Sequence, residues 1–383
     1  MKKVLTRREA IQATLGAGLV SALGCRRKKA LGFSGYAFVA NQEGNSVAAV
    51  DLEVFAVARH IHLDASPTQV LAGRMAAWAL TPDTGSIHEI RADTLTFSRK
   101  VRIAAAAAGA LMAPDNQAIY VLCRDPRKLV KLAAPSLKTV WEAPLAGDAT
   151  HFDVAPDGNT IAVSYGVRRS IGFFEAGSGR PYPAVDAPGE IGAVRFQADS
   201  SQLLAANREG HELAVFQTAT RKLVVTLPLS LRPDCLCFSA DGGQLFVTGE
   251  GMDGVVVVYP YYTPQIGETV LAGHTPGVMA ASKLPGKGYL FVANPSSGDV
   301  SILSIDTQRV VAVTPVGTDP GSITITPDDQ YALVLNRVSG DMAVLRIANI
   351  TKAVSQQRRS RKAPLFMLIP VGSKPVSAAV VGI

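Results

Sequence analysis

Hydrophobic residues in this chain come in short runs, and each run ends at Gly, Pro, Asn, Asp or Ser. Residues 289–330 show the pattern most clearly, as the runs YLFVAN, DVSILSID, RVVAVTPV and GSITIT. Short alternating or fully apolar runs that are bounded by turn residues predict β-strands. Four such strands form one antiparallel sheet that cannot bury both of its faces alone, so similar sheets must stack on either side of it.

The same unit repeats along the chain from residue 36 onward. Successive copies are 39–45 residues apart and begin near Tyr36, Met75, Ala118, Thr160, Gln202, Gln244, Tyr289 and Tyr331. A four-stranded unit with this period is the signature of a β-propeller blade. The sequence therefore predicts an all-β fold in which residues 36–383 form one β-propeller with eight blades.

The two ends of the repeat array complement each other. Residues 36–41 occupy the position of a second strand, and residues 375–381 (PVSAAVV) occupy the position of a first strand. We expect these N- and C-terminal strands to pair in one blade, because closing the ring removes the edges that an open array would expose. The alanine run at 104–108 favours helix by propensity, but its place in the repeat predicts a loop or the start of a strand.

Two segments also resemble a known repeat family. FVAN is followed by valine and aspartate at 38–51 and again at 291–306, and Pro-Val-Gly and Pro-Asp turns follow. This pattern resembles the YVTN repeat, and the resemblance covers residues 36–383. It implies a propeller similar to YncE-like and lactonase-like proteins, which usually have seven blades, so seven is the alternative to the count of eight. The matching turns are structural, so no catalytic residue is carried over from the family.

Residues 1–24 have the features of an export signal. Four basic residues, among them Arg7 and Arg8, precede an apolar stretch at 11–23 that is too short to span a bilayer. Thr6-Arg7-Arg8 resembles the twin-arginine export motif, and the general secretory route is the alternative.

A cysteine at the end of this segment completes a second motif. Ala22-Leu23-Gly24-Cys25 resembles a lipobox, which implies that Cys25 is acylated and that residues 25–35 form a basic, lipid-attached tether. In the repeat, a basic insertion at 351–364 falls at the same end of the ring as this tether. An acyl chain together with a basic patch attaches a protein to lipid more firmly than either alone. We therefore expect a lipid-anchored protein in the periplasm or at the cell surface.

The basic charge is confined to these segments. Residues 1–29 account for the whole formal net charge of +7, and the insertion at 351–364 carries five basic and no acidic side chains. The remaining propeller is mildly acidic. A nucleic-acid partner is therefore not expected, because neutralisation of phosphates supplies most of the non-specific affinity for nucleic acid.

Several motif matches are interpreted as structural. GEGMDG at 249–254 matches G-x-G-x-x-G, but a strand follows where dinucleotide binding requires a helix, so we interpret it as a hairpin. His88-Glu89 and His211-Glu212 begin like a zinc motif but lack the second histidine. The odd number of cysteines beyond Cys25 predicts buried thiols and no disulfide framework. No metal and no cofactor is expected.

The candidate site follows from the strand order. Propeller sites usually lie over the central channel, at the end where the turns between second and third strands meet the crossings into first strands. Arginine dominates this end and offers bidentate hydrogen bonds to carboxylates and phosphates. Each residue alone is more commonly a solvated loop residue, but the set predicts a pocket. The candidate ligand-binding residues are Arg124, Arg168, Asn207, Arg208, His211, Arg232, His274, Asn294, Asn336 and Arg337.

Two functions from different classes fit this set. The first is a monomeric binding or scaffolding propeller without catalysis, which holds an anionic small molecule or a protein partner. The second is a lactonase-like hydrolase, in which Arg208 orients a carboxylate and His151 or Glu250 transfers protons. We favour the first. A hydrolase requires His151 or Glu250 to meet an arginine across one cleft.

Overall fold

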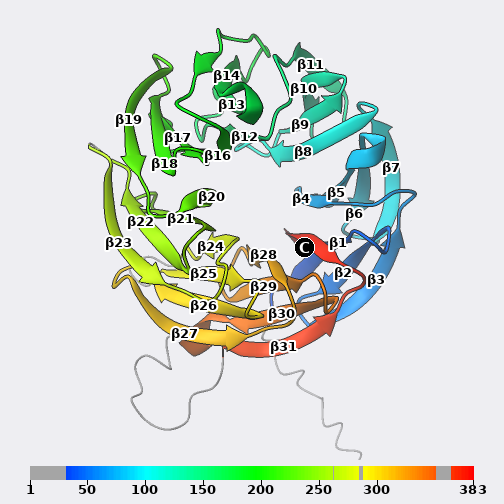
Figure 1. The fold of residues 1–383 in the computed structure, drawn as a ribbon. Helices are drawn as coiled ribbons and strands as arrows, with labels where there is room; N and C mark the ends of the chain where they lie inside the picture. Colours follow the sequence, from blue (N-terminus) through cyan, green and yellow to red (C-terminus); the bar gives the residue numbers. More distant parts are fainter. Residues whose placement is uncertain (1–31, 262, 284–287, 351–363) are drawn as a thin grey trace, which may run out of the picture. The chain divides into compact units, whose positions relative to one another are not determined.

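The structure is a computed structural model that describes residues 32–261, 263–283, 288–350 and 364–383. Within these ranges, 32 strands form eight four-stranded antiparallel sheets, arranged as blades around a central axis (Figure 1). The predicted all-β propeller with eight blades is confirmed, and the alternative of seven is wrong. The predicted export signal, Cys25 and residues 351–363 of the basic insertion lie outside the described residues.

We label the strands of each blade a to d from the axis outward. Blades 1 to 4 contain, in the order a to d, β32 (Pro375–Gly382), β1 (Gly35–Asn41), β2 (Ser46–Asp51) and β3 (Ala56–His62); β4 (Gln69–Ala72), β5 (Ala76–Thr81), β6 (Ser86–Arg91) and β7 (Thr96–Arg102); β8 (Ala106–Met112), β9 (Ala118–Asp125), β10 (Arg127–Ala133) and β11 (Thr139–Pro144); and β12 (His151–Val154), β13 (Thr160–Tyr165), β14 (Ser170–Glu175) and β15 (Val185–Asp186).

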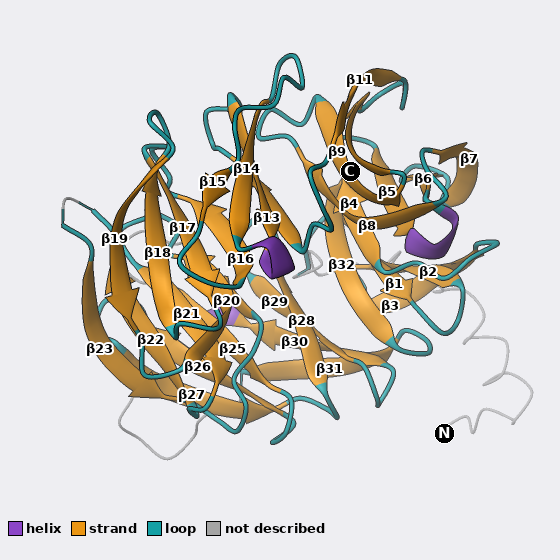
Figure 2. Cartoon of the chain, turned by 45° about the horizontal axis from the view of Figure 1, so that its top comes forward, coloured by secondary structure: helices purple, strands orange, loops and turns teal. Residues whose placement is uncertain are grey.

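Blades 5 to 8 contain, in the same order, β16 (Ile191–Phe196), β17 (Gln202–Asn207), β18 (Glu212–Gln217) and β19 (Lys222–Pro228); β20 (Arg232–Phe238), β21 (Leu245–Glu250), β22 (Gly254–Tyr259) and β23 (Gln265–Leu271); β24 (Met279–Ala281), β25 (Tyr289–Asn294), β26 (Asp299–Ser304) and β27 (Arg309–Pro315); and β28 (Pro320–Ile325), β29 (Tyr331–Asn336), β30 (Asp341–Arg346) and β31 (Leu365–Pro370). Two short 3-10 turns, η1 (Pro82–Thr84) and η2 (Gly166–Arg168), accompany the strands that dominate Figure 2. The alanine run at 104–108 leads into β8, as its place in the repeat predicts.

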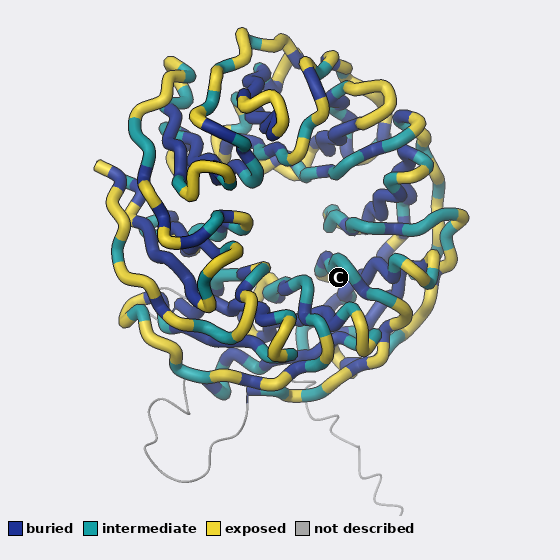
Figure 3. The backbone as a smooth tube through the Cα atoms, in the orientation of Figure 1, coloured by how far each residue is buried: buried dark blue, intermediate teal, exposed yellow. Residues whose placement is uncertain are grey.

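The hydrophobic core lies between neighbouring blades, in the b and c strands. All six residues of β25 are buried, whereas most of the outer strand β27 of the same blade is exposed or half-buried (Figure 3). Val39 of blade 1, for example, belongs to one buried cluster with Leu333 of blade 8. Because both faces of a b strand pack on neighbouring sheets, its sequence is an unbroken apolar run such as YLFVAN.

The ring closes through β1 and β32, the first and the last strand (Figure 1). Their antiparallel pairing extends from Gly35 opposite Gly382 to Asn41 opposite Pro375. Both neighbouring blades also bond to β32. Val70 N donates to Ser377 Oγ at 3.1 Å, and Thr324 Oγ1 donates to the carbonyl of Ala378 at 3.1 Å. The predicted pairing of the chain ends is therefore confirmed.

A buried asparagine ends the b strand in four of the described blades. In blade 7, Asn294 Nδ2 donates to Asp299 Oδ1 at 2.7 Å across the b–c turn. The crossing into the same blade passes directly over this amide, since a Cβ at Gly273 would come within 2.6 Å of the Asn294 side chain. The pairs Asn41 and Gly372, Asn207 and Gly189, and Asn336 and Gly317 repeat the approach. In these four blades, asparagine and glycine together thus fix where the crossing meets its own b–c turn.

The antiparallel order divides the loops between two ends of the ring. The b–c turns and the crossings from d to a lie at one end, which we call the crossing end. The a–b and c–d turns lie at the other, which we call the hairpin end, and residues 32–34 enter β1 from there. Within the described ranges, no helix has the length and apolar character needed to cross a membrane.

Deleting residues 375–383 should remove the closing strand and severely destabilise the fold. The deletion exposes the edge of β1 and leaves the bonding partners in blades 2 and 8 without acceptors. Several lost interactions of about 1 kcal/mol each lower the melting temperature of the whole ring by roughly 10 °C or more. Deleting only Ile383, which is 62% exposed, is the control and should have little effect. Thermal unfolding followed by circular dichroism measures both, and an unchanged melting temperature after the longer deletion contradicts the closure.

Candidate functional site

Three adjoining cavities open at the crossing end of blades 4 to 7. They have volumes of about 400, 230 and 580 Å³. The first and third share Arg208, and the first and second share Asp234 and Cys235. We call the residues around this junction, His151, Arg208, Arg232, Asp234 and Glu250, the Arg208 mouth.

Four blade elements bring these side chains together. His151 begins the inner strand β12, and Arg232 begins the inner strand β20, which also carries Asp234. Arg208 follows β17 in a b–c turn, and Glu250 ends β21. Residues up to about a hundred positions apart therefore line adjoining cavities, because each lies at the crossing end of a blade.

The Arg208 guanidinium has donors that the protein does not use. Its Nη1 and Nη2 lie 3.6 Å from Asp234 Oδ1 and 3.7 Å from Glu250 Oε1, which is beyond hydrogen-bond length. Its Nε is buried and has no partner among the described residues. Glu250 is held more closely by Arg232, at 2.8 Å. A planar carboxylate or phosphate can therefore accept two hydrogen bonds from Arg208.

The backbone holds Arg208 in this position. Its amide donates to the Glu190 carbonyl at 2.9 Å, and the turn that follows is tied by Asn207 Nδ2 to Glu212 Oε1 at 2.8 Å. The aliphatic part of Arg208 lies over Gly192, where a Cβ would stand 3.0 Å from its Cδ. Glycine at this point of the inner strand leaves room for the aliphatic part of Arg208.

His151 is a half-buried imidazole in the cavity of about 400 Å³ that it shares with Arg208. Burial, helped by the nearby positive charge of Arg195, lowers the pKa of His151 to about 4. Its Nδ1 is buried without a partner among the described residues. The ring is therefore neutral near pH 7 and lacks the carboxylate that commonly orients a catalytic histidine.

The sequence analysis did not predict the ion pair between Arg195 and Asp153, and Arg195 lines the same cavity as His151. Arg195 Nη1 lies 3.2 Å from Asp153 Oδ1, and the Phe196 amide donates to Asp153 Oδ2 at 2.8 Å. Burial raises the pKa of Asp153, and Arg195 opposes that change. Both residues interrupt apolar inner strands, HFDV and IGAVRF, and a charge inside such a strand is the signal that could have identified them.

The cysteines offer no reactive thiolate here. Cys123, Cys235 and Cys237 are free, which agrees with the prediction of no disulfide framework. Cys123 is buried as predicted, whereas Cys235 and Cys237 are only partly buried. Burial raises the pKa of Cys235, which lines the Arg208 mouth, to about 11. The thiol therefore stays protonated at neutral pH and is a poor nucleophile.

Of the other predicted residues, only His211 lines a cavity of the Arg208 mouth. Asn207, Asn294 and Asn336 are buried and use their amide donors within b–c turns. Arg168 donates to the Ala146 carbonyl, and Arg124 is exposed at the end of β9. His274 Nδ1 is exposed and lies 2.7 Å from Asp253 Oδ2. The structure thus brings together His151, Arg208, His211, Arg232 and Glu250 and leaves the rest outside this group.

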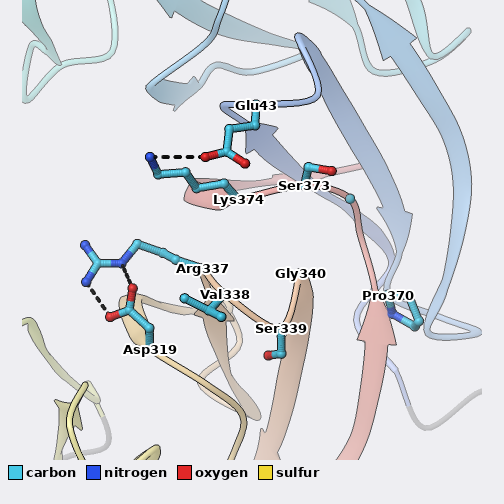
Figure 4. Close-up of a pocket in the computed structure, with 10 residues that line it drawn as sticks. Glu43, Asp319, Arg337, Val338, Ser339, Gly340, Pro370, Ser373 and Lys374 are labelled. Carbon is cyan, nitrogen blue, oxygen red and sulfur yellow. Dashed lines mark hydrogen bonds and ion pairs between the residues drawn. The ribbon is translucent and has the colours of Figure 1, made fainter.

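Arg337 lines a separate cavity of about 710 Å³ between blades 8 and 1 (Figure 4). Its guanidinium binds both carboxylate oxygens of Asp319, at 2.8 and 2.6 Å. Lys374 lies 3.5 Å from Glu43 on the other side of the cavity. Because Arg337 already donates to both oxygens of Asp319, as Figure 4 shows, its guanidinium offers less to an anion than that of Arg208 does.

The Arg208 mouth is suited to binding more than to covalent chemistry. Its ion pairs are partly exposed, and such pairs contribute little to stability, so a ligand can replace them at small cost. Among the described residues, no group of three or more His, Cys, Asp or Glu side chains is placed to hold a metal ion.

Comparisons with known proteins support the fold. No family model matches the chain. A stretch of 144 residues, 36% of this chain and 36% of the relative, is 29% identical to the "Seven-bladed beta-propeller protein Rv1057" of Mycobacterium tuberculosis (strain ATCC 25618 / H37Rv). The chain thus matches about a third of the length of this curated relative.

Solved structures share the architecture at low sequence identity. A "Dihydro-heme d1 dehydrogenase NirN in complex with DHE" is similar over 91% of this chain and 75% of its own, with a TM-score of 0.74 and 16% identity. Hydrazine synthase of Kuenenia stuttgartiensis is similar over 74% of this chain and 96% of its own, with a TM-score of 0.59 and 16% identity. This chain is therefore a β-propeller with propeller relatives, and these likenesses show the fold alone.

Stability should depend on pH through His151. The unfolded imidazole takes a proton below its ordinary pKa of about 6.5, whereas the folded one does so only near 4. The folded state therefore loses stability as the pH falls from about 6.5 to 4, by on the order of 3 kcal/mol relative to a His151→Gln variant. Urea unfolding of both proteins at several pH values measures the difference. If the two curves keep a constant offset across this range, the imidazole is not held neutral by burial.

Proposed function

We propose that this chain is a non-catalytic binding propeller that holds an anionic small molecule at the Arg208 mouth. The observation that carries the proposal is the state of Arg208, whose Nε is buried without a partner and whose two Nη atoms lie beyond hydrogen-bond length from their acids. A ligand carboxylate or phosphate supplies the acceptors that the protein withholds. An acidic segment of a protein partner is the alternative occupant of the same surface.

A structurally similar propeller is known in complex with a ligand. The NirN structure of the same architecture is described as a dihydro-heme d1 dehydrogenase in complex with DHE. Tetrapyrroles of the haem class carry several carboxylates, so they belong among the anions to be tested here. We keep the YVTN-type resemblance as part of the proposal, because its repeat pattern fits the observed blades.

A lactonase-like hydrolase is the weaker reading of the site. His151 and Arg208 do line one cavity, and Glu250 does lie beside two arginines. A histidine with a pKa of about 4 is, however, a weak base at neutral pH, and general bases work best when their pKa is near the working pH. Glu250 is engaged by Arg232 at 2.8 Å. Binding requires none of these groups to change protonation.

Anions that fit the Arg208 mouth should raise the melting temperature, because a ligand that binds only the folded state stabilises it. The panel for thermal shift contains di- and tricarboxylates, phosphate esters and haemin. Replacing Arg208 and Arg232 together by alanine should then weaken the best of these ligands by about 1.5–3 kcal/mol for each charge-assisted hydrogen bond lost.

Isothermal titration of that ligand measures the effect, with Arg124→Ala as the matched control, since Arg124 is an exposed arginine at the same end of the ring. The proposal is contradicted if no anion of the panel stabilises the protein, or if the double variant binds as tightly as the parent.

We also propose that the protein is exported and anchored to a membrane through an acyl chain on Cys25, on the sequence evidence of Arg7, Arg8 and the lipobox-like segment before Cys25. Expressed in bacteria, the protein should incorporate labelled palmitate and sediment with membranes. Cys25→Ala should abolish the label and move the protein to the soluble fraction, whereas Cys123→Ala should change neither. Equal labelling of the Cys25→Ala variant and the parent would show that the acyl chain is elsewhere.

A further inference from the structure

A cavity at the hairpin end lies on the opposite side of the ring from the Arg208 mouth. It has a volume of about 510 Å³ and lies between blades 2 and 3. Its walls come from the a–b turns, through Arg74 and Gln117, from the b strand β5, through Trp78, and from the c–d turn of blade 3, through Pro135. The function proposed above does not use this cavity.

One wall of the cavity is apolar and flat. Trp78 lines it while being only 6% exposed, and Met75 beside it is 54% exposed. The indole lies over Gly73, where a Cβ would come within 2.3 Å of the ring, so glycine at this point leaves room for the tryptophan. The indole Nε1 is buried and has no acceptor among the described residues. Buried donors are almost always bonded, so this unpaired indole nitrogen is unusual.

The wall on the blade 3 side is held in place by Arg99. Its guanidinium pairs with Glu89 of blade 2 and donates to the Pro135 and Ser136 carbonyls of blade 3, at 2.6 and 3.0 Å. The two blades are therefore tied together across the base of the cavity. The gap between these two sheets therefore exists before any small molecule binds in it.

Among the residues that the structure describes, the charges around the cavity leave the Arg74 guanidinium without a partner. Arg91 donates to both carboxylate oxygens of Asp93, at 3.0 and 2.5 Å, and Glu89 is taken by Arg99. Arg74, in the turn between β4 and β5, has no hydrogen-bond or ion-pair partner among the described residues. The cavity thus combines an apolar, partly aromatic wall with a single unpaired guanidinium.

We propose that this cavity binds an organic anion with a flat aromatic body, whose ring lies against Trp78 and Met75 and whose carboxylate or sulfonate pairs with Arg74. Burying the ring supplies non-directional affinity, and the guanidinium selects the charged form. This site is independent of the Arg208 mouth, because the two lie at opposite ends of the ring and share no residue.

The test uses a pair of fluorescent probes that differ in charge. Anilinonaphthalene sulfonate carries one negative charge, and phenylnaphthylamine is its neutral analogue. The chain has two tryptophans, Trp78 and Trp141, so Trp141→Phe leaves Trp78 as the only tryptophan that can transfer energy to a bound probe. In this variant, we expect excitation of Trp78 to produce probe emission, and the sulfonate to bind about tenfold more tightly than the neutral probe.

Adding Arg74→Gln should reduce that ratio to about one, while leaving the affinity for the neutral probe unchanged. Arg309→Gln is the matched control, since Arg309 is exposed at the hairpin end of blade 7, and it should keep the tenfold ratio. Circular dichroism checks that each variant is folded. The proposal is overturned if Trp78 transfers no energy to either probe, or if the preference for the sulfonate survives Arg74→Gln.

Discussion

The pairing of β32 with β1 is the interaction on which the rest of this fold depends. Each blade is a sheet with two apolar faces, so it is stable only between two neighbours, and a linear array of eight blades would leave two such faces uncovered. The last strand removes these uncovered faces, because it pairs with β1 as the innermost strand of the first blade and so closes the ring. The same strand also accepts hydrogen bonds from blades 2 and 8, so it links three neighbouring blades.

Closure also decides where chemistry can occur. Once the ring is fixed, the b–c turns and the crossings lie at one end, and in four blades an Asn and Gly pair holds these loops against their own blade. Side chains next to these fixed points, such as Arg208 directly after Asn207, are therefore displayed from a rigid base.

Charge alone does not identify the site. Both the Arg208 mouth and the cavity of Arg337 hold arginines beside acids, yet Arg337 is bonded to both oxygens of Asp319 and Arg208 is not bonded to either of its acids. The N to O distances differ by only about 1 Å, but this separates a guanidinium that is bonded to its acid from one that can still donate to a ligand. The same reasoning distinguishes Arg74 from Arg91 at the hairpin end.

The sequence by itself determined the blade, the number of blades and the closing strand. Alternating apolar runs, turn residues and a constant period depend on local chemistry that every blade repeats, so they can be read without coordinates. The candidate end of the ring also followed from strand direction. What only the tertiary structure decided is which loop residues meet. Arg208 and Glu250 are far apart in the chain but lie side by side in the structure. Asn294 and Asn336 are equally good candidates for ligand binding by sequence, but in the structure their amide groups donate to aspartates within b–c turns. Arg195 and Trp78 were missed because a side chain's neighbours across two blades depend on the angle between sheets, which no local pattern encodes.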